Sequence, residues 1–195
     1  MGMPRRLVLG STSRYRAELL GRLGLAFEQR APGTLEVESP SEAPATRAMR
    51  LAVAKSIDAG AGLADALVIG SDQVAELDGT LLEKPGSVER ASAQLQACSG
   101  RAVSFHTALC VFDTRSRQRH THLDLTRVHF RTLQPDEISR YVEREQPLDC
   151  AGSFKCEGLG ISLFERIDTS DPTALIGLPL IALAKLLREA GLSVP

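Results

Sequence analysis

Short apolar runs that end in small polar residues alternate along this chain with stretches of helical periodicity, and that alternation constrains the fold most. Leu7-Val8-Leu9-Gly10 and Ala66-Leu67-Val68-Ile69-Gly70 have the continuous apolar character of buried strands. Other segments carry apolar residues at the spacing of amphipathic helices. Buried strands that alternate with such helices are typical of the α/β class, so we expect a mixed sheet flanked by helices.

Periodicity and turn signals predict the remaining elements. The second strand is expected to stop at Ser71-Asp72, and a further glycine-punctuated strand is expected from Gly158 to Phe164. A hairpin should join Val103 to Phe112 with Leu123 to Phe130. Helices are expected through Leu19, Leu20 and Leu23; through Ala48, Leu51, Ala52 and Lys55; through Val88, Ala91 and Leu95; from Pro135 through Ile138, Tyr141 and Val142; and from about Pro179 through Leu183 and Leu187.

Bulk properties limit the classes of protein to consider. A chain of 195 residues can bury a sizeable core as one unit, so we expect a single domain over 1-195. The formal net charge of -1 gives no reason to expect nucleic acid or an anionic membrane as a partner. The four cysteines form no CxxC pair, and the sequence shows neither a signal peptide nor a stretch long enough to span a membrane. We therefore expect a reduced, cytoplasmic protein.

The segment Ser11 to Arg16 is the first candidate site. It joins the first strand to a helix N-terminus, where free N–H groups and the positive end of the helix dipole favour an anion. Arg14 and Arg16 in a first helical turn are unfavourable alone, and a bound phosphate would relieve them. The simpler alternative is that Ser13 only caps the helix.

Asp72 is the second candidate, because α/β sheets bind their ligands at the carboxyl ends of their strands. It could also cap the following turn or bind a metal. Lys55, Lys84 and Glu36 each have an ordinary explanation, at a helix end or in a loop. Together with Asp72 they supply what phosphoryl transfer needs: cations for phosphate oxygens, carboxylates for a metal and one base.

Five short blocks make up a recognisable combination. They are Leu9-Gly10-Ser11-Thr12-Ser13-Arg14-Tyr15-Arg16, Gly70-Ser71-Asp72-Gln73-Val74, Glu83-Lys84-Pro85, Ala151-Gly152-Ser153 and Ile176-Gly177-Leu178-Pro179. In this order, over about Leu7 to Gly191, they closely resemble the Maf family of nucleoside triphosphate pyrophosphatases. The resemblance implies hydrolysis of a nucleoside triphosphate to the monophosphate and pyrophosphate with a divalent metal. It also implies an elongated α/β body with a central cleft, shared with inosine triphosphate pyrophosphatases.

The resemblance assigns roles to particular residues. It implies that Asp72 is the proton acceptor and, with Glu36, binds Mg²⁺ or Mn²⁺. The residues that it implies for phosphate binding are Ser11, Arg16, Lys55 and Lys84. A free aspartate, with a pKa near 3.9, is a weak base for bulk water, which is why a metal that acidifies water is needed.

The chain departs from the family pattern at two places. Arg14 stands where members commonly have proline, and Ala17 where they have a second arginine. Leu35 precedes Glu36, where members commonly place an aspartate, so Glu38 remains an alternative to Glu36 as the cleft acid.

Two residues resemble those of one branch of the family, the 7-methyl-GTP pyrophosphatases. Gln73 and Glu157 match that branch, whereas the dTTP/UTP branch tends to carry Thr and Gln there. A carboxylate such as Glu157 could accept hydrogen bonds from N1–H and the amino group of guanine. Methylation at N7 makes the base cationic, so Tyr15 could attract it by a cation–π interaction. In the alternative, Tyr15 is core and Glu157 a surface charge.

The expected function is therefore hydrolysis of 7-methyl-GTP to 7-methyl-GMP and pyrophosphate. Two alternatives remain: hydrolysis of dTTP, UTP or another non-standard triphosphate, and a regulator of cell division that binds nucleotide without turnover. The expected ligands are a small-molecule nucleotide and a divalent metal, with no nucleic acid and no membrane. A homodimer is a family expectation.

Overall fold

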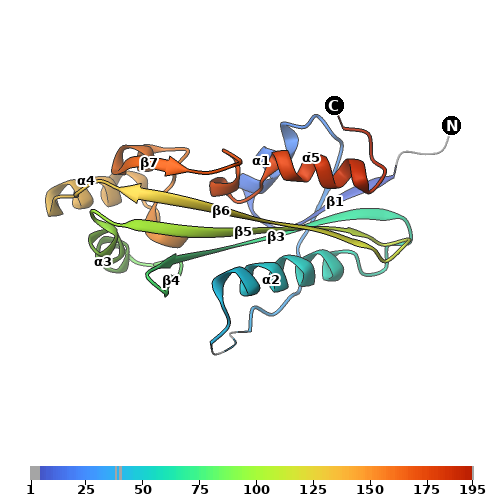
Figure 1. Ribbon diagram of the computed structural model, residues 1–195, viewed down its shortest axis with the longest axis horizontal. Coiled ribbons are helices and arrows are strands. Elements are labelled where there is room, and N and C mark those ends of the chain that lie inside the picture. Colours follow the sequence, from blue (N-terminus) through green and yellow to red (C-terminus); the bar gives the residue numbers. More distant parts are fainter. Residues whose placement is uncertain (1–4, 38, 40, 195) are drawn as a thin grey trace. The chain divides into compact units, whose positions relative to one another are not determined.

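A computed structural model describes residues 5–37, 39 and 41–194 (Figure 1). The strands are β1 Arg6–Gly10, β2 Glu28–Arg30, β3 Ala66–Leu77, β4 Thr80–Leu82, β5 Ala102–Asp113, β6 Arg119–Phe130 and β7 Phe164–Asp168. The α-helices are α1 Arg14–Gly21, α2 Pro44–Ala59, α3 Val88–Cys98, α4 Pro135–Glu145 and α5 Leu180–Glu189, and the 3₁₀ helices are η1 Ala151–Ser153, η2 Leu159–Leu163 and η3 Ala174–Ile176.

The strands form one mixed sheet in the order β2-β1-β3-β5-β6-β7, with β4 paired to β3. This confirms the predicted α/β class with a mixed sheet. The chain divides into two compact units, and β3, β5 and β6 each supply residues to both. Unit 1 holds the described residues of Met1–Gln73, Thr107–Asp124 and Asp171–Pro195, and unit 2 holds Val74–His106 and Leu125–Ser170. The single domain over 1-195, the elongated outline and the central cleft remain predictions.

Unit 1 is built around the parallel strands β1, β2 and β3. Figure 1 shows α2 on one face of these strands and α1 and α5 on the other. The layer under α1 and α5 is apolar: Leu19 and Leu20 from α1 and Leu183 and Leu187 from α5 pack with strand residues such as Ile69. The apolar periodicity of the sequence therefore corresponds to real buried faces.

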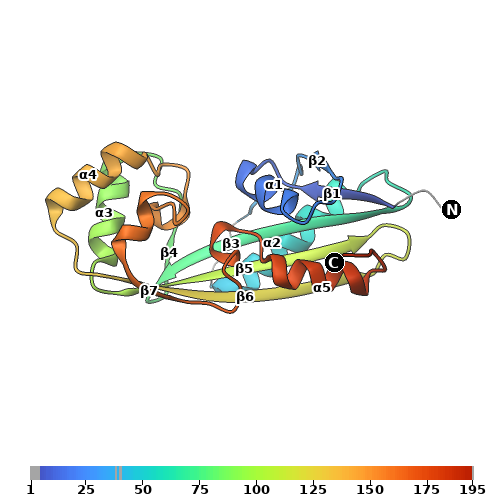
Figure 2. The same ribbon diagram turned by 90° about the horizontal axis from the view of Figure 1, so that it is seen from above.

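Unit 2 pairs the end of β3 with β4 and the end of β6 with β7, both antiparallel. Its helices α3 and α4 pack against each other (Figure 2). Four phenylalanines meet edge to face in its core, with ring centroids 4.8–5.6 Å apart: Phe105, Phe130, Phe154 and Phe164. Unit 2 thus has an aromatic core of its own.

The strand that begins at Ala66 does not stop at Ser71-Asp72, so that prediction is wrong. β3 continues to Leu77, because its second half pairs with β4 through Ala75 and Leu82 and buries further apolar residues. Asp72 therefore lies inside the strand. A strand tolerates buried polar residues where their side chains have hydrogen-bond partners.

The segment Gly158 to Phe164 is also not a strand. It forms the 3₁₀ helix η2, and β7 begins only at Phe164. Gly160 explains the difference: its N–H donates to the Lys155 carbonyl over 3.0 Å, and a Cβ at Gly160 would collide with that carbonyl. The apolar side chains of Leu159 and Ile161 remain exposed. A short apolar run does not by itself distinguish a strand from a helical turn.

The other predicted helices and the β5–β6 hairpin are found, whereas the three-residue strand β2 was not expected. Within the described part of the chain, no helix combines the length and apolar character needed to cross a bilayer. The cytoplasmic location and the homodimer remain predictions.

Candidate active site

The structure brings three of the predicted site residues of unit 1 into one ion cluster. The Nζ atom of Lys55 lies 2.6 Å from Oδ1 of Asp72 and 2.6 Å from Oε1 of Glu36. The side chains of Lys55 and Asp72 are 11% and 10% exposed, whereas that of Glu36 is 53% exposed. One ammonium therefore bridges a buried carboxylate on β3 and an open carboxylate on a loop. Asp72 is not a turn cap.

Two glycines let α2 approach the strands closely enough for this contact. A Cβ at Gly70 would collide with the carbonyl of Ala52 and lie 2.7 Å from the Ser56 nitrogen, and one at Gly10 would lie 2.8 Å from the Ala59 Cβ. Gly70 and Asp72 are two residues apart on one strand, so their side-chain positions face the same side. The close helix approach at Gly70 thereby puts Lys55 beside Asp72.

Burial and charge act in opposite directions on the Asp72 carboxyl. Burial raises the pKa of Asp72, and the nearby Lys55 and Arg16 reduce that effect without cancelling it. Burial also lowers the pKa of the Arg16 guanidinium, against the charges of Asp72 and Glu36. A carboxylate that is held in its charged form less firmly than a free one is a better proton acceptor near neutral pH.

The segment after β1 forms the predicted helix N-terminus. The Ser13 hydroxyl caps α1 by accepting from the Arg16 nitrogen over 3.4 Å, which confirms the capping role. The Ser11 hydroxyl accepts from the Ser13 nitrogen at 3.1 Å and from Nη1 of Arg16 at 3.4 Å. Ser11 and Arg16 are thus in contact, as a shared phosphate site requires, while phosphate binding itself remains a prediction.

A turn that precedes α5 anchors both Arg16 and β3. The Gly177 carbonyl accepts from Nε of Arg16 and from the Ser71 hydroxyl, each at 2.9 Å. Gly177 has φ +115°, a conformation that glycine adopts readily, and a Cβ there would lie 3.4 Å from the Arg16 Nε. The sequence marked Ile176 to Pro179 only as a family block and did not indicate this role, since backbone carbonyls leave no trace in a sequence.

Gln73, which follows Asp72 on β3, contacts the turn that precedes α5. Its Nε2 donates to Oγ1 of Thr107 at 2.9 Å and to the carbonyls of Ala174 and Leu175, each at 3.1 Å. Thr107 is fully buried on β5 and carries no motif, so sequence reasoning missed it. Asp72 and Gln73 therefore belong to two different networks, one with α2 and one with the turn.

Tyr15 is half-buried and is already covered by a cation. The guanidinium carbon of Arg14 lies 4.7 Å from the centre of the Tyr15 ring, and Nη2 of Arg14 donates to the Tyr15 hydroxyl at 2.8 Å. Arg14 is the residue that replaces the family's proline. The ring can therefore hold a positive charge on its face, as the predicted cation–π role requires.

Two predicted site residues, Lys84 and Glu157, lie in unit 2 and are both exposed. Lys84 follows β4, and the Glu157 carboxylate accepts a weak hydrogen bond from the thiol of Cys156 at 3.4 Å. Their roles toward phosphate and nucleobase remain predictions. Glu38, the alternative cleft acid, lies outside the described residues.

Glu36 and Asp72 have the chemistry of a hard-metal site. Carboxylate oxygens suit Mg²⁺ and Mn²⁺, and Mg²⁺ is commonly held by one or two carboxylates together with phosphate oxygens. Both side chains already converge on one cation, the Lys55 ammonium. Among the residues that the structure describes, no group of three or more His, Cys, Asp or Glu is arranged to hold a metal. The metal remains a prediction.

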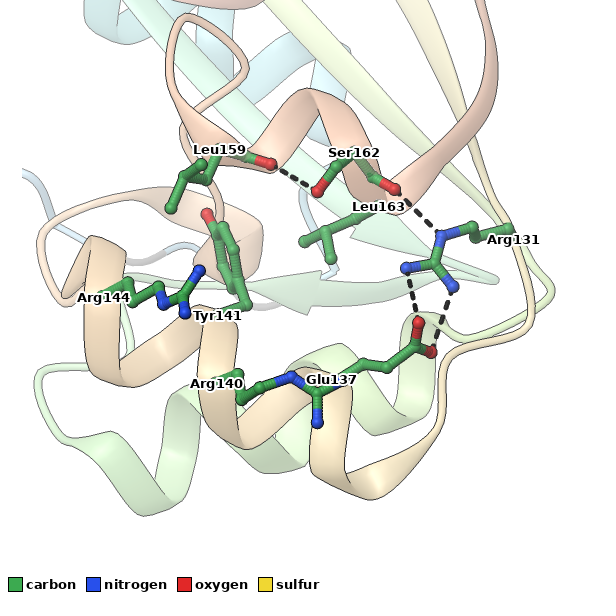
Figure 3. A pocket seen from close by; sticks show the side chains of 8 residues that line it. All are labelled: Arg131, Glu137, Arg140, Tyr141, Arg144, Leu159, Ser162 and Leu163. Carbon is green, nitrogen blue, oxygen red and sulfur yellow. Dashed lines mark hydrogen bonds and ion pairs between the residues drawn. The ribbon is translucent and has the colours of Figure 1, made fainter.

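Unit 2 also contains a cavity of about 190 Å³ between α4 and η2 (Figure 3). Arg131 crosses its edge, paired through both terminal nitrogens with Glu137, and donates from Nε to the Ser162 carbonyl at 2.9 Å. Tyr141 and Leu163 also line the cavity (Figure 3). None of the predicted site residues lines it, and the contacts of Arg131 join α4 to η2.

Comparison with known proteins agrees with these features. Residues 6–190 match the family described as Maf-like protein, so the chain belongs to the Maf-like protein family. The chain is 57% identical over 193 residues to a protein of Xanthomonas axonopodis pv. citri (strain 306) named 7-methyl-GTP pyrophosphatase, covering 99% of this chain and 100% of that protein. A Burkholderia pseudomallei (strain K96243) protein of the same name is 53% identical over 191 residues, covering 96% and 89%.

A solved structure, that of the Staphylococcus aureus Ham1 protein, aligns with 65% of this chain and 72% of that chain at 16% identity, with a TM-score of 0.47. This likeness is too loose to carry an argument. The family resemblance that the five sequence blocks predicted is confirmed by the match to the Maf-like family.

Proposed function

We propose that the protein is a nucleotide pyrophosphatase that hydrolyses 7-methyl-GTP to 7-methyl-GMP and pyrophosphate. The activity is a hydrolysis of a phosphoric anhydride. The substrate is the one that relatives 53–57% identical over nearly their whole length carry in their names. The proposal also needs a site on this chain that can move a proton and hold a polyphosphate.

One observation carries the proposal: the cluster in which Lys55 bridges buried Asp72 and open Glu36. Asp72 is the proton acceptor, because burial raises its pKa toward neutral pH and so strengthens it as a base. Lys55 favours the ionised form of that carboxylate. In the complex its ammonium also faces phosphate oxygens, which compete with Asp72 and Glu36 for the same charge.

Phosphate binding falls to the neighbouring cations and to the helix N-terminus. Arg16 is fixed through its Nε to the Gly177 carbonyl, and its Nη1 donates to the Ser11 hydroxyl just before α1. A guanidinium held in this way loses little freedom when it binds phosphate. Lys84 is assigned the same role by family resemblance.

Mg²⁺ or Mn²⁺ held by Glu36 and Asp72 would supply an acidified water and neutralise charge on the triphosphate. Base selection is assigned to Tyr15, Gln73 and Glu157. The Tyr15 ring, which already accepts the Arg14 cation, provides a face for a base that methylation has made cationic. Glu157 provides acceptors for the donors of guanine.

Pyrophosphate release tests the proposal directly. The purified chain is incubated with 7-methyl-GTP, GTP, UTP or dTTP, with and without Mg²⁺ or Mn²⁺. We expect metal-dependent release, fastest from 7-methyl-GTP. Faster release from UTP or dTTP would contradict 7-methyl-GTP as the preferred substrate but support the pyrophosphatase reaction. Nucleotide binding with no release under any condition would refute the enzyme and favour the nucleotide-binding regulator.

A further inference from the structure

We propose that Thr107 orients the amide of Gln73 so that Gln73 offers its carbonyl oxygen, and not its NH₂ group, to the nucleobase. Thr107 is then a positioning residue for base selection. The inference rests on the proposed function, since it states how that site prefers guanine. All the groups involved belong to unit 1.

The amide direction follows from what surrounds its nitrogen. Nε2 of Gln73 has three oxygen neighbours: Oγ1 of Thr107 at 2.9 Å and the carbonyls of Ala174 and Leu175 at 3.1 Å each. Carbonyl oxygens can only accept hydrogen bonds. If the amide were reversed, Oε1 would face two carbonyls with no hydrogen between them. These two carbonyls therefore favour the orientation in which the NH₂ group points at the protein.

Thr107 adds a third constraint on the direction of the Gln73 amide. A hydroxyl can donate or accept, and would by itself tolerate either end of an amide. The single proton of Thr107 goes to the Ala174 carbonyl at 3.2 Å, so Thr107 can show Gln73 only a lone pair. The hydroxyl thereby becomes a third acceptor around Nε2, and Oε1 of Gln73 keeps its lone pairs for another partner.

The acceptors are held firmly in place. Thr107 is fully buried on β5. The turn that carries the carbonyls is fixed by Asp171, which is 3% exposed and accepts from the Thr173 nitrogen at 2.9 Å and from the Ile181 nitrogen at 2.7 Å. Preorganised groups of this kind discriminate between ligands because they do not rearrange to suit the wrong one.

The consequence is a preference for a base edge that donates. Guanine has an N1–H and an amino group on its pairing edge, whereas adenine has an acceptor at N1. An acceptor fixed at Oε1 and placed opposite N1 pairs with the N1–H of guanine and repels the N1 lone pair of adenine, whose donor on this edge is the amino group at C6. Unpaired acceptors in a binding site are a strong source of rejection.

The test compares Thr107→Val, which keeps the shape but removes the hydroxyl, with Thr107→Ser, which keeps the hydroxyl. The measured quantity is kcat/KM for 7-methyl-GTP divided by kcat/KM for ATP. We expect this ratio to fall about 5- to 10-fold in Thr107→Val, as the loss of one hydrogen bond implies, through a higher KM for 7-methyl-GTP with kcat nearly unchanged. Thr107→Ser should retain the wild-type ratio.

Thr114 supplies a matched control. It is also a buried threonine, and among the residues that the structure describes its hydroxyl bonds to the backbone of Ala66. Thr114→Val should lower the melting temperature without moving the ratio. An unchanged ratio in folded Thr107→Val, or an equal fall in Thr107→Ser, overturns the inference.

A second measurement separates this inference from the proposed function. The side-chain NH₂ protons of Gln73 should exchange slowly with water in wild type and faster in Thr107→Val, as NMR of the nitrogen-15-labelled protein would report. Fast exchange in wild type overturns the amide orientation even if 7-methyl-GTP is hydrolysed. Absence of turnover with slow exchange overturns the proposed function and leaves the orientation standing.

Discussion

The two units each contain a carboxylate paired with a cation, and burial makes the two pairs behave in opposite ways. In unit 1 the side chains of Lys55 and Asp72 are 11% and 10% exposed, and burial raises the pKa of Asp72 despite its partner. In unit 2 the side chains of Arg131 and Glu137 are 36% and 27% exposed, and the Arg131 hydrogen bond lowers the pKa of Glu137. Asp72 is therefore a stronger base than a free aspartate, whereas Glu137 is a weaker base than a free glutamate.

This difference distinguishes the pair that we propose for chemistry from a structural one. Taking Asp72 out of water costs more than Lys55 returns, which is expected for buried ion pairs and typical of functional sites. Glu137 remains near water and also accepts from the backbone nitrogen of Gln134 at 2.9 Å, so that it starts α4. A carboxylate paired with a cation is therefore proposed for chemistry in unit 1 and starts a helix in unit 2.

Asp72→Asn should produce the largest effect, because it removes the carboxylate that we propose for chemistry in unit 1. Loss of a general base lowers kcat by about 10²- to 10⁴-fold. Because the folded pKa of Asp72 is raised, its ionised form weighs against folding as pH rises from the ordinary aspartate value through the folded one. Lys55 also keeps Glu36 as an ion-pair partner in this variant, so the variant should melt no lower than wild type at pH 7.

Steady-state kinetics at saturating metal and a thermal melt measure both parts. Turnover equal to wild type would remove Asp72 from the chemistry. A clear fall in melting temperature would mean that the pair stabilises the fold after all.

Lys55→Met should leave a buried carboxylate without its cation. Breaking a buried pair from one side typically costs about 3–5 kcal/mol, so the free energy of unfolding in urea should fall by that amount. The double variant Lys55→Met with Asp72→Asn removes both charges and should recover most of the loss. A cost below about 1 kcal/mol in the single variant would contradict the buried pairing.

Gly70→Ala tests whether the close approach of α2 creates the pair. The new Cβ would collide with the Ala52 carbonyl, so α2 must move away, at a cost of about 1–3 kcal/mol. Displacement of Lys55 should lower kcat/KM by up to about 100-fold. Gly21→Ala is the matched control, since nothing lies within 4 Å of a Cβ there. Equal behaviour of the two variants would show that the approach is unimportant.

Glu137→Gln should have the smallest effect, and it tests whether the pair in unit 2 is purely structural. Because the pKa of Glu137 is lowered, its ion pair stabilises the fold above the ordinary glutamate pKa of about 4.3, and that contribution disappears as pH falls through the lower folded value. The variant should melt slightly below wild type at neutral pH, match it in strong acid and keep full pyrophosphatase activity. Reduced turnover with an unchanged melt would contradict a purely structural role.

Local signals in the sequence were sufficient for much of the fold. The apolar run at Leu7 defined β1, and helical spacing defined α2 and α5, because a buried face imposes its period on the residues that form it. Local patterns failed where a distant segment decided the outcome. β3 passes through Asp72 because β4 pairs with its far half, and η2 replaces a strand because Lys155 holds Gly160.

The candidate site divides in the same way. The sequence by itself predicted which residues carry the chemistry: Asp72, Lys55, Arg16 and Ser11 follow from residue type and from the family resemblance. Only the tertiary structure decided that one ammonium joins Asp72 to Glu36, that glycine at position 70 permits it, and that Thr107 faces Gln73. The physical reason is that pKa shifts and hydrogen-bond direction depend on burial and on partners far away along the chain, which residue type alone does not contain.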